Sequence, residues 1–206
     1  NLVNTSSTPV SVTVAFHSDD GTAWSLPATF SQEGATQRTE DSSVNTTINP
    51  KSTLIISAGD GIPSTSTGWA DVISTESLGG FAIFRSTPES GLPSEGTVPL
   101  QAQLPYNLTF PYDNTSGFVM GLALANTSVL PANITATIWD ETGNRLGAEI
   151  LSLAASGHTS FVLPTRIPLT AGKRGIVQFQ NWSGGGLAGV GLRFSPFGTF
   201  TSVPTI

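Results

Sequence analysis

A match between two segments of the chain limits its fold more than any other sequence feature. The segment Asn126–Gly143 aligns without a gap on Asn4–Gly21, a shift of 122 residues. Both segments begin with Asn-Thr-Ser, have a proline five residues after the asparagine, continue with alternating apolar residues and end at a glycine. Such internal similarity indicates that one structural unit occurs twice. We therefore predict two related domains, at residues 1–103 and 104–206.

Alternation of apolar and polar residues predicts that the repeated unit consists of β-strands. In Val10–Phe16 every second residue is a valine or phenylalanine, and Ala132–Trp139 alternates in the same way. A period of two places these side chains on one face of a sheet. Similar short segments recur between Gly, Pro and Asn residues, and no segment has a sustained helical period. We expect an all-β chain of two tandem Ig-like antiparallel β-sandwiches that arose by internal duplication.

The composition predicts a surface rich in hydroxyl groups and poor in charge. Charged residues make up 11% of the chain, against about 25% in a typical soluble domain, and Ser and Thr fill about a quarter of it. The net charge of −6 argues against nucleic-acid binding, which needs clustered Lys and Arg. There is no cysteine and no apolar run of the roughly 20 residues that span a bilayer. We expect an extracellular or cell-surface protein without a membrane span.

Several short motifs follow one another in an order that is more specific than any one of them. They are Gly68-Trp69-Ala70, Ala82-Ile83-Phe84-Arg85, Glu95–Pro99, Gly121–Asn126, Gly157-His158-Thr159, Gly191-Leu192-Arg193 and Thr201–Pro204. In this order they resemble an uncharacterised duplicated β-module of large secreted and cell-surface proteins of soil bacteria. The resemblance implies an exported β-protein and supplies no catalytic residues. It also implies a full strand ahead of the position of Leu2, which makes the N-terminal strand of the first sandwich a truncated one.

Residues suited to catalysis or metal binding are sparse. The chain has two histidines, His17 and His158, each beside a predicted turn, and neither a cysteine nor a Gly-x-Ser-x-Gly motif. Two separate histidines do not predict a zinc site. The acidic pairs Asp19-Asp20 and Asp140-Glu141 have oxygen ligands for calcium, but each precedes a turn glycine. Acids scattered in turns also disfavour a glycosidase carboxylate pair. We expect no enzymatic activity, no metal and no cofactor.

Seven of the ten asparagines lie in Asn-x-Ser/Thr sequences. These are Asn4, Asn45, Asn107, Asn114, Asn126, Asn133 and Asn181. One interpretation is N-glycosylation of a secreted surface. The other is turn chemistry, because an asparagine side chain can bond the backbone of its own turn. Both interpretations stay open at the level of sequence.

The N-terminal strand of the first predicted sandwich is shorter than its counterpart in the second. Asn1, Leu2 and Val3 occupy the place that the strand Phe118–Leu124 fills in the second repeat. A sheet short of a strand exposes unpaired backbone groups, which a strand from another chain can pair. Two alternatives are that residues ahead of Asn1 belong to this strand, or that the C-terminal segment of the same chain fills the gap. Contacts between chains that do not close on themselves produce filaments.

These features predict a non-catalytic structural or adhesive protein. The specific prediction is a self-associating subunit of a cell-surface filament or sheath, with Asn1, Leu2 and Val3 in the inter-subunit strand. The alternative prediction is a carbohydrate-binding module of a secreted protein, in which Trp139 and Trp182 stack on a glycan.

Overall fold

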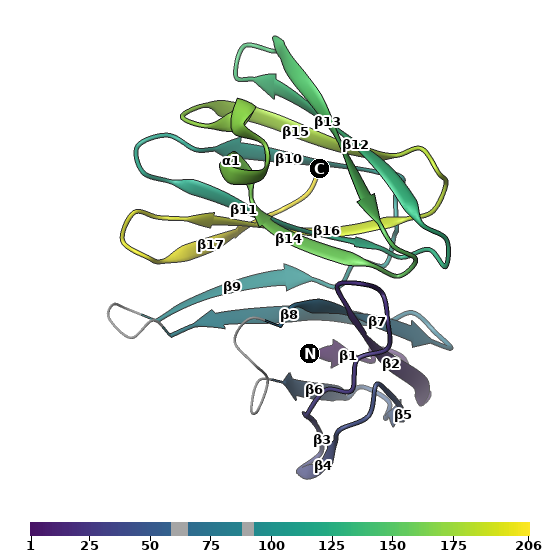
Figure 1. The fold of residues 1–206 in the computed structure, drawn as a ribbon. Helices are drawn as coiled ribbons and strands as arrows, with labels where there is room; N and C mark the ends of the chain where they lie inside the picture. Colours follow the sequence, from purple (N-terminus) through teal and green to yellow (C-terminus); the bar gives the residue numbers. More distant parts are fainter. Residues whose placement is uncertain (59–65, 88–92) are drawn as a thin grey trace. The chain divides into compact units, whose positions relative to one another are not determined.

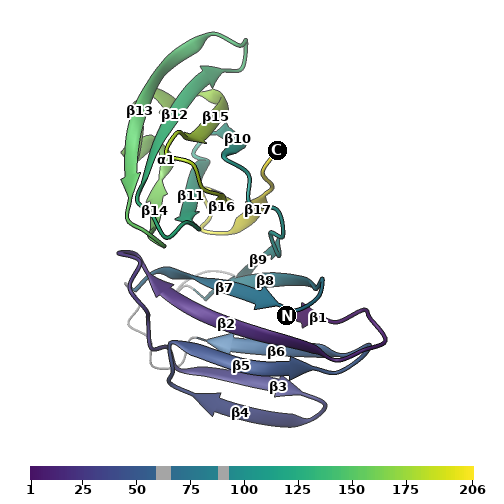
Figure 2. The ribbon, with the colours of Figure 1, turned by 90° about the vertical axis from the view of Figure 1, so that its right-hand side faces the viewer.

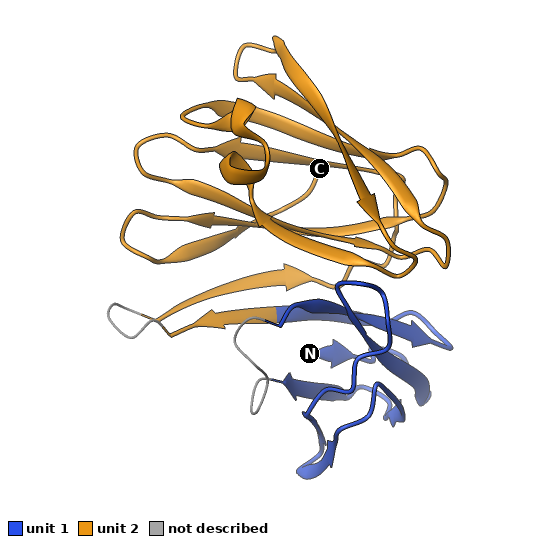
Figure 3. Cartoon of the chain, in the orientation of Figure 1, with its two compact units in different colours: residues 1–82 blue, residues 83–206 orange. Residues whose placement is uncertain are grey.

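The regular secondary structure of the described residues is antiparallel β-sheet apart from two short helical turns. The computed structural model describes residues 1–58, 66–87 and 93–206, and these form four sheets (Figure 1). The chain divides into two compact units, Asn1–Ala82 and Ile83–Ile206 (Figure 3). This boundary lies inside strand β8 (Gly79–Ser86), ahead of the sequence-based division after residue 103. The all-β class predicted from the alternating residues is confirmed.

The second unit has two four-stranded sheets that face each other as layers (Figure 2). One sheet has the order β10 (Asn107–Asp113), β15 (Arg174–Asn181), β12 (Ala132–Asp140), β13 (Arg145–Leu153). The other has the order β14 (His158–Val162), β11 (Val119–Asn126), β16 (Leu187–Phe194), β17 (Phe200–Val203). The two helical turns, α1 (Leu163–Arg166) and η1 (Pro168–Thr170), follow β14.

Alternate residues of both sheets fill one apolar core in the second unit. Phe110 and Phe179 are fully buried, and their rings meet edge to face with centroids 6.1 Å apart. Leu163 and Ile167, from the helical segment after β14, are also fully buried in this core. Burial of each such side chain contributes about 1.5–3 kcal/mol. Two facing sheets with one shared core give this unit a β-sandwich-like architecture.

The first unit contains a three-stranded sheet and most of a six-stranded one. The smaller sheet has the order β5 (Ser43–Ile48), β2 (Val10–Ser18), β7 (Gly68–Ser74). The larger has the order β4 (Ala35–Thr39), β3 (Ala28–Gln32), β6 (Thr53–Ala58), β1 (Leu2–Val3), β8, β9 (Ser94–Pro99). The last strand, β9, belongs to the second unit. The core of the first unit is formed by the alternating Val10, Val12, Val14 and Phe16 with Phe30 and Leu54.

The central strands β2 and β12 have the same surroundings in their respective units. Their nine residues have the same sequence of buried and exposed positions, starting at Val10 and at Ala132. Each strand ends in a turn in which a glycine with φ of 84° donates its N–H to the carbonyl three residues earlier, Gly21 to Ser18 and Gly143 to Asp140. These positions correspond at the 122-residue shift found in the sequence.

The strand pairings of the two units also correspond, with one exception. His17 lies opposite Trp69 in the β2–β7 pair, and the equivalent Trp139 lies opposite Ile176 in the β12–β15 pair. Strand β7 therefore holds the position of β15, and its register is the same. However, β15 has β10 on its other edge, whereas β7 pairs with β2 alone among the described strands. In the second unit the outer edge of β15 is paired with β10, whereas the equivalent edge of β7 is unpaired among the described strands.

A glycine occupies the same crowded position in both units. Gly68 begins β7 beside the end of β2, and Gly175 lies at the equivalent place in β15. A Cβ atom on Gly68 would collide with the carbonyl oxygen of His17, and one on Gly175 with that of Trp139. The obstacle is backbone in each case, which cannot rotate away as a side-chain end can.

We therefore expect Gly68→Ala and Gly175→Ala each to lower the free energy of unfolding by about 1–3 kcal/mol, the usual effect of inserting an atom into a filled site. Guanidinium denaturation of the variants measures this change. Gly79→Ala is the matched control, since its Cβ would meet nothing closer than 3.9 Å. Equal stability of Gly68→Ala and Gly79→Ala would contradict the steric explanation.

Candidate functional site

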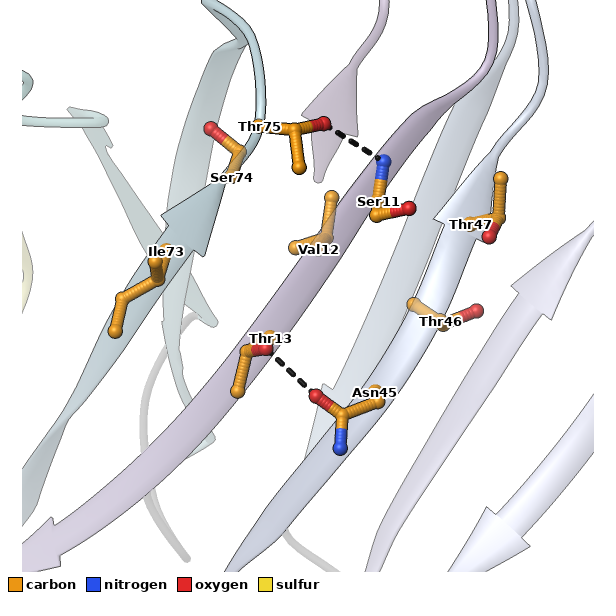
Figure 4. A pocket seen from close by; sticks show the side chains of 9 residues that line it. All are labelled: Ser11, Val12, Thr13, Asn45, Thr46, Thr47, Ile73, Ser74 and Thr75. Atoms are coloured by element: carbon orange, nitrogen blue, oxygen red, sulfur yellow. Dashed lines mark hydrogen bonds between the residues drawn. The ribbon is translucent and has the colours of Figure 1, made fainter.

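The outer face of the three-stranded sheet in the first unit carries an open groove of about 350 Å³ (Figure 4). Strands β2, β5 and β7 and the residue after β7 form its walls. The lining residues are Ser11, Val12, Thr13, Asn45, Thr46, Thr47, Ile73, Ser74 and Thr75. None of these nine side chains is ionisable, so the groove has no acid or base of its own.

Hydrogen bonds hold the polar groups of this groove in place. The Thr13 hydroxyl donates to Asn45 Oδ1 at 2.6 Å, and the Ser11 backbone N–H donates to Thr75 Oγ1 at 3.2 Å (Figure 4). Ile73 adds an apolar side chain that is 61% exposed. Hydroxyl and amide groups next to one apolar surface fit a neutral ligand with many hydroxyl groups better than a charged one.

Trp182 occupies the corresponding place on the outer face of the second unit. It follows β15 as Thr75 follows β7, and both are next to the same residue position of the central strand. The indole Nε1 donates to Thr135 Oγ1 at 3.1 Å, and the side chain is 68% exposed. Thr135 is the equivalent of Thr13. An exposed flat ring thus lies in the second unit where the first has its groove.

Trp139, the other predicted stacking residue, lies far from Trp182 on the same face. It is half-buried at the end of β12, beside the irregularity between Ile138 and Trp139 in the β12–β13 pair. Trp182 is next to Asn133 at the start of β12, six residues away. A strand rises about 3.4 Å per residue, so the two positions are roughly 20 Å apart. The structure does not bring them together for one sugar ring.

The residues predicted to form an inter-subunit strand are paired within their own chain. Leu2 and Val3 form β1, which lies between β6 and β8 with antiparallel partners on both edges. The ammonium group of Asn1 donates to the carbonyl of Phe81 at 2.9 Å. The C-terminal segment pairs with β10 through Thr109 and Ile206 in the second unit, not with the first. Strand β1 therefore has no open edge.

The seven asparagines of the Asn-x-Ser/Thr sequences fall into two groups. Asn45, Asn107 and Asn133 are exposed. Four are buried, with relative exposures from 0% to 8%: Asn4, Asn114, Asn126 and Asn181. In the folded chain only the exposed group has room for a glycan.

The buried asparagines Asn4 and Asn126 make equivalent connections in the two units. Each Oδ1 accepts the N–H of the serine two residues later, Ser6 at 2.9 Å and Ser128 at 3.1 Å. The Nδ2 group of Asn126 donates to the carbonyls of Leu130 and Ala154, both at 2.8 Å. That of Asn4 donates to three carbonyls, the nearest at 2.8 Å. These contacts are the turn chemistry that the sequence left as one of two interpretations.

We expect Asn4→Ala and Asn126→Ala to lower the free energy of unfolding by about 2–4 kcal/mol, because each leaves several buried carbonyls without a donor. Thermal and guanidinium denaturation provide the measurement. Asn133→Ala, at an exposed asparagine of the same sequence type, should change stability by less than about 0.5 kcal/mol. If Asn133→Ala costs as much as Asn126→Ala, burial is not what makes these asparagines important.

The acidic pairs considered for calcium are used inside their own turns. Hydrogen bonds from the Ser18 and Thr22 hydroxyls lower the pKa of Asp20 to about 2. Hydrogen bonds from the Thr142 hydroxyl and the Asn144 backbone N–H lower the pKa of Asp140 to about 2. These carboxylates stay ionised at ordinary pH and organise the turn backbone. Across the described residues, no three acidic or histidine side chains are arranged to hold a metal ion.

An ionic cluster ties together three strands of the second unit. Asp113 of β10 forms ion pairs with Arg174 at 3.2 Å and Arg193 at 2.8 Å. The Arg193 guanidinium lies 3.5 Å from the centre of the Phe118 ring. Burial alone would raise the pKa of Asp113, but the hydrogen bonds from Thr115 and the two arginines hold it well below its usual range. The cluster thus connects β10 with β15 and β16.

The two histidines belong to different units. His17 lies on β2 and stacks on Trp69, with ring centroids 4.9 Å apart. His158 starts β14 and is 9% exposed. No helix within residues 1–58, 66–87 and 93–206 has the length and apolar character to span a membrane.

Comparison of the chain with protein-family models, with curated proteins and with solved structures finds no match. The function of the chain is therefore inferred from its own sequence and structure.

Proposed function

We propose that this chain is a non-catalytic extracellular structural or adhesive protein that joins other chains through β-strand contacts. In this proposal it is a subunit of a cell-surface filament or sheath. In this proposal its two domains are copies of one Ig-like sandwich. The open edge of β7 is the observation that carries the proposal.

Three correspondences support the duplication. The central strands β2 and β12 share their pattern of burial, and their turns share the glycine geometry. Asn4 and Asn126 bond the same relative positions. Gly68 pairs with Ser18 and Gly175 pairs with Asp140, and Ser18 and Asp140 correspond at the 122-residue shift. Independent sandwiches would have no reason to agree in register as well as in turn residues.

Exposed core-facing residues support association through the first unit. Ala70 of β7 lies opposite the buried Phe16 and so points toward the core, yet it is exposed. Val72 of the same strand, opposite the buried Val14, is only half-buried. A sheet with an open edge and an uncovered apolar face is a template for another strand. In β-augmentation, a strand of another chain pairs with such an edge.

The surface chemistry fits a location outside the cell. Hydroxyl-rich strands with few charges carry little mutual repulsion and tolerate close packing against neighbours. The exposed Asn45, Asn107 and Asn133 are the positions at which a glycan would add to this surface.

The proposal predicts that the purified chain forms oligomers or filaments whose mass grows with protein concentration. Light scattering coupled to size-exclusion chromatography measures the mass, and negative-stain electron microscopy shows the assemblies. Ala70→Glu should reduce assembly, because it would bury a charge at the β7 contact. Ile73→Glu, on the outer face of the same strand, is the matched control. A chain that stays monomeric at every concentration would exclude self-assembly as its function.

Trp182 favours a second candidate, a carbohydrate-binding module. An indole that is 68% exposed beside threonine and glutamine side chains can stack on the apolar face of a sugar ring. We expect Trp182→Ala to abolish retention on insoluble polysaccharides if this is the function. Phe197→Ala, at an aromatic residue that is 86% exposed elsewhere, should leave retention unchanged. Absence of any polysaccharide retention by the unmodified chain would remove this candidate.

A further inference from the structure

We infer that the outer face of the β10–β15–β12–β13 sheet binds an uncharged, extended polysaccharide chain, which lies along β12 from Trp182 to Trp139 (Figure 1). This inference rests on the second candidate function, sugar binding at Trp182, and deepens it. It adds a second stacking ring, the hydrogen-bonding groups between the two rings and the class of polysaccharide.

Alternate residues of β12 form a row along this face, between two indole rings. Thr135, Thr137 and Trp139 are on the side of β12 that faces away from the core, and each is half-buried. The indole Nε1 of Trp182 donates to Thr135 Oγ1 at 3.1 Å, so the Trp182 ring lies at the Thr135 end of the row. Trp139 follows Thr135 by four positions of β12, which is about 13 Å at the rise of a strand. Several linked sugar rings fit within this length, whereas a single sugar ring cannot touch both indoles.

The adjacent strand β15 adds amide groups to the middle of this row and an apolar side chain to its end. Pairing with β12 places Gln180, Gln178 and Ile176 of β15 beside Thr135, Thr137 and Trp139, in that order. Each glutamine is half-buried, and its side-chain amide has both donors and an acceptor. Ile176 is 41% exposed and extends the apolar surface next to Trp139. The row thus has apolar surface at each end and amide and hydroxyl groups between the ends.

This arrangement matches the two kinds of surface that a sugar ring presents. The C–H groups of a pyranose ring stack on the flat face of an indole, and its hydroxyl groups exchange hydrogen bonds with amides and hydroxyls. None of the four threonine and glutamine side chains between the two rings is ionisable. The middle of the row therefore offers no charge to an acidic or basic ligand, which favours a neutral one.

The two rings are fixed on one sheet, and this favours a ligand that is straight. Strand β12 is paired on both edges, by β13 and β15, and the hydrogen bond to Thr135 holds the Trp182 indole in place. A site that is ordered before binding loses little conformational freedom when the ligand arrives. Chains of β-1,4-linked pyranose rings, such as cellulose and chitin, are straight and flat, whereas α-linked chains such as amylose coil. We assign the straight, β-linked class to this site.

The first unit lacks one end of this arrangement. Thr75 follows β7 at the place where Trp182 follows β15, so a hydroxyl group replaces the indole there. At the other end, His17 is the equivalent of Trp139, and its ring stacks on Trp69 with centroids 4.9 Å apart. One face of the His17 ring is therefore already covered. These differences assign the site to the second unit.

The test titrates the ¹⁵N-labelled chain with cellohexaose and chitohexaose, because each of the four tryptophans has its own indole N–H signal in the NMR spectrum. The signals of Trp139 and Trp182 should shift together and with the same midpoint, while those of Trp24 and Trp69 should stay in place. The hexasaccharide should bind about tenfold more tightly than the disaccharide of the same sugar, because only the longer ligand reaches both rings. The α-linked maltohexaose should lack this advantage over maltose.

Two variants at one position separate stacking from a structural role of the side chain. Trp139→Leu should remove the advantage of the hexasaccharide, because leucine is apolar but has no flat ring, whereas Trp139→Tyr should keep most of it. Thermal denaturation checks that both variants fold. Equal loss in the two variants would contradict stacking at this position.

The remaining outcomes distinguish the inference from the candidate function beneath it. A shift of the Trp182 signal alone, or a length dependence that survives Trp139→Leu, would overturn the extended site and leave sugar binding at Trp182 standing. Shifts confined to Trp24 and Trp69 would place binding in the first unit and overturn the assignment. No shift of any indole signal with either β-linked hexasaccharide would overturn both the extended site and sugar binding at Trp182.

Discussion

Hydrogen bonding along both edges of the central strands is the constraint on which each unit depends. A strand inside a sheet must pair its backbone groups with a neighbour on either side, and its core-facing residues must be covered by the opposite sheet. Strand β12 meets both conditions, between β13 and β15 with Ile134 and Ile138 fully buried. Strand β2 meets them as well. The next strands differ. Strand β15 is paired on both edges, by β12 and β10, whereas β7 is paired only with β2 among the described strands.

Asparagine turns join the strands of the two units in the same manner. The buried Asn4 and Asn126 each satisfy several carbonyls that strand pairing leaves without a donor. In a chain with no cysteine, such buried side-chain hydrogen bonds fix the loops that disulfides fix in many exported domains. The two Asp turns act on the surface in a related way. In one turn the Ser18 hydroxyl donates to Asp20, and in the other the Thr142 hydroxyl donates to Asp140, so donor and acceptor have exchanged places.

Alternating residues and the internal repeat were sufficient to predict the all-β class and most strands, because buried faces impose a period of two. Strand β4 was missed because four of its five residues are exposed and polar or small; it is held by the Glu33-Gly34 turn to β3. The helical turns at 163–170 were missed because one buried residue per turn has no recognisable period. The sequence does not distinguish the buried Asn126 from the exposed Asn133, since each is the asparagine of an Asn-x-Ser/Thr sequence. Burial depends on partners such as Leu130 and Ala154, which the fold brings together.

The two units are similar but differ at one sheet edge. The sequence placed this difference at residues 1–3, whereas the structure places it at β7. Residues 1–3 were expected to be the exposed strand because they match only the end of β11. They instead pair on both edges, because β1 lies between β6 and β8 in the same way that β11 lies between β14 and β16. Among the described strands of the first unit none corresponds to β10, which pairs with β15, the counterpart of β7. Its three buried side chains show how much apolar surface one edge strand covers, and the ion pairs of Asp113 show how firmly it is held. The second unit therefore shows how one edge strand covers the core-facing side chains of its neighbour.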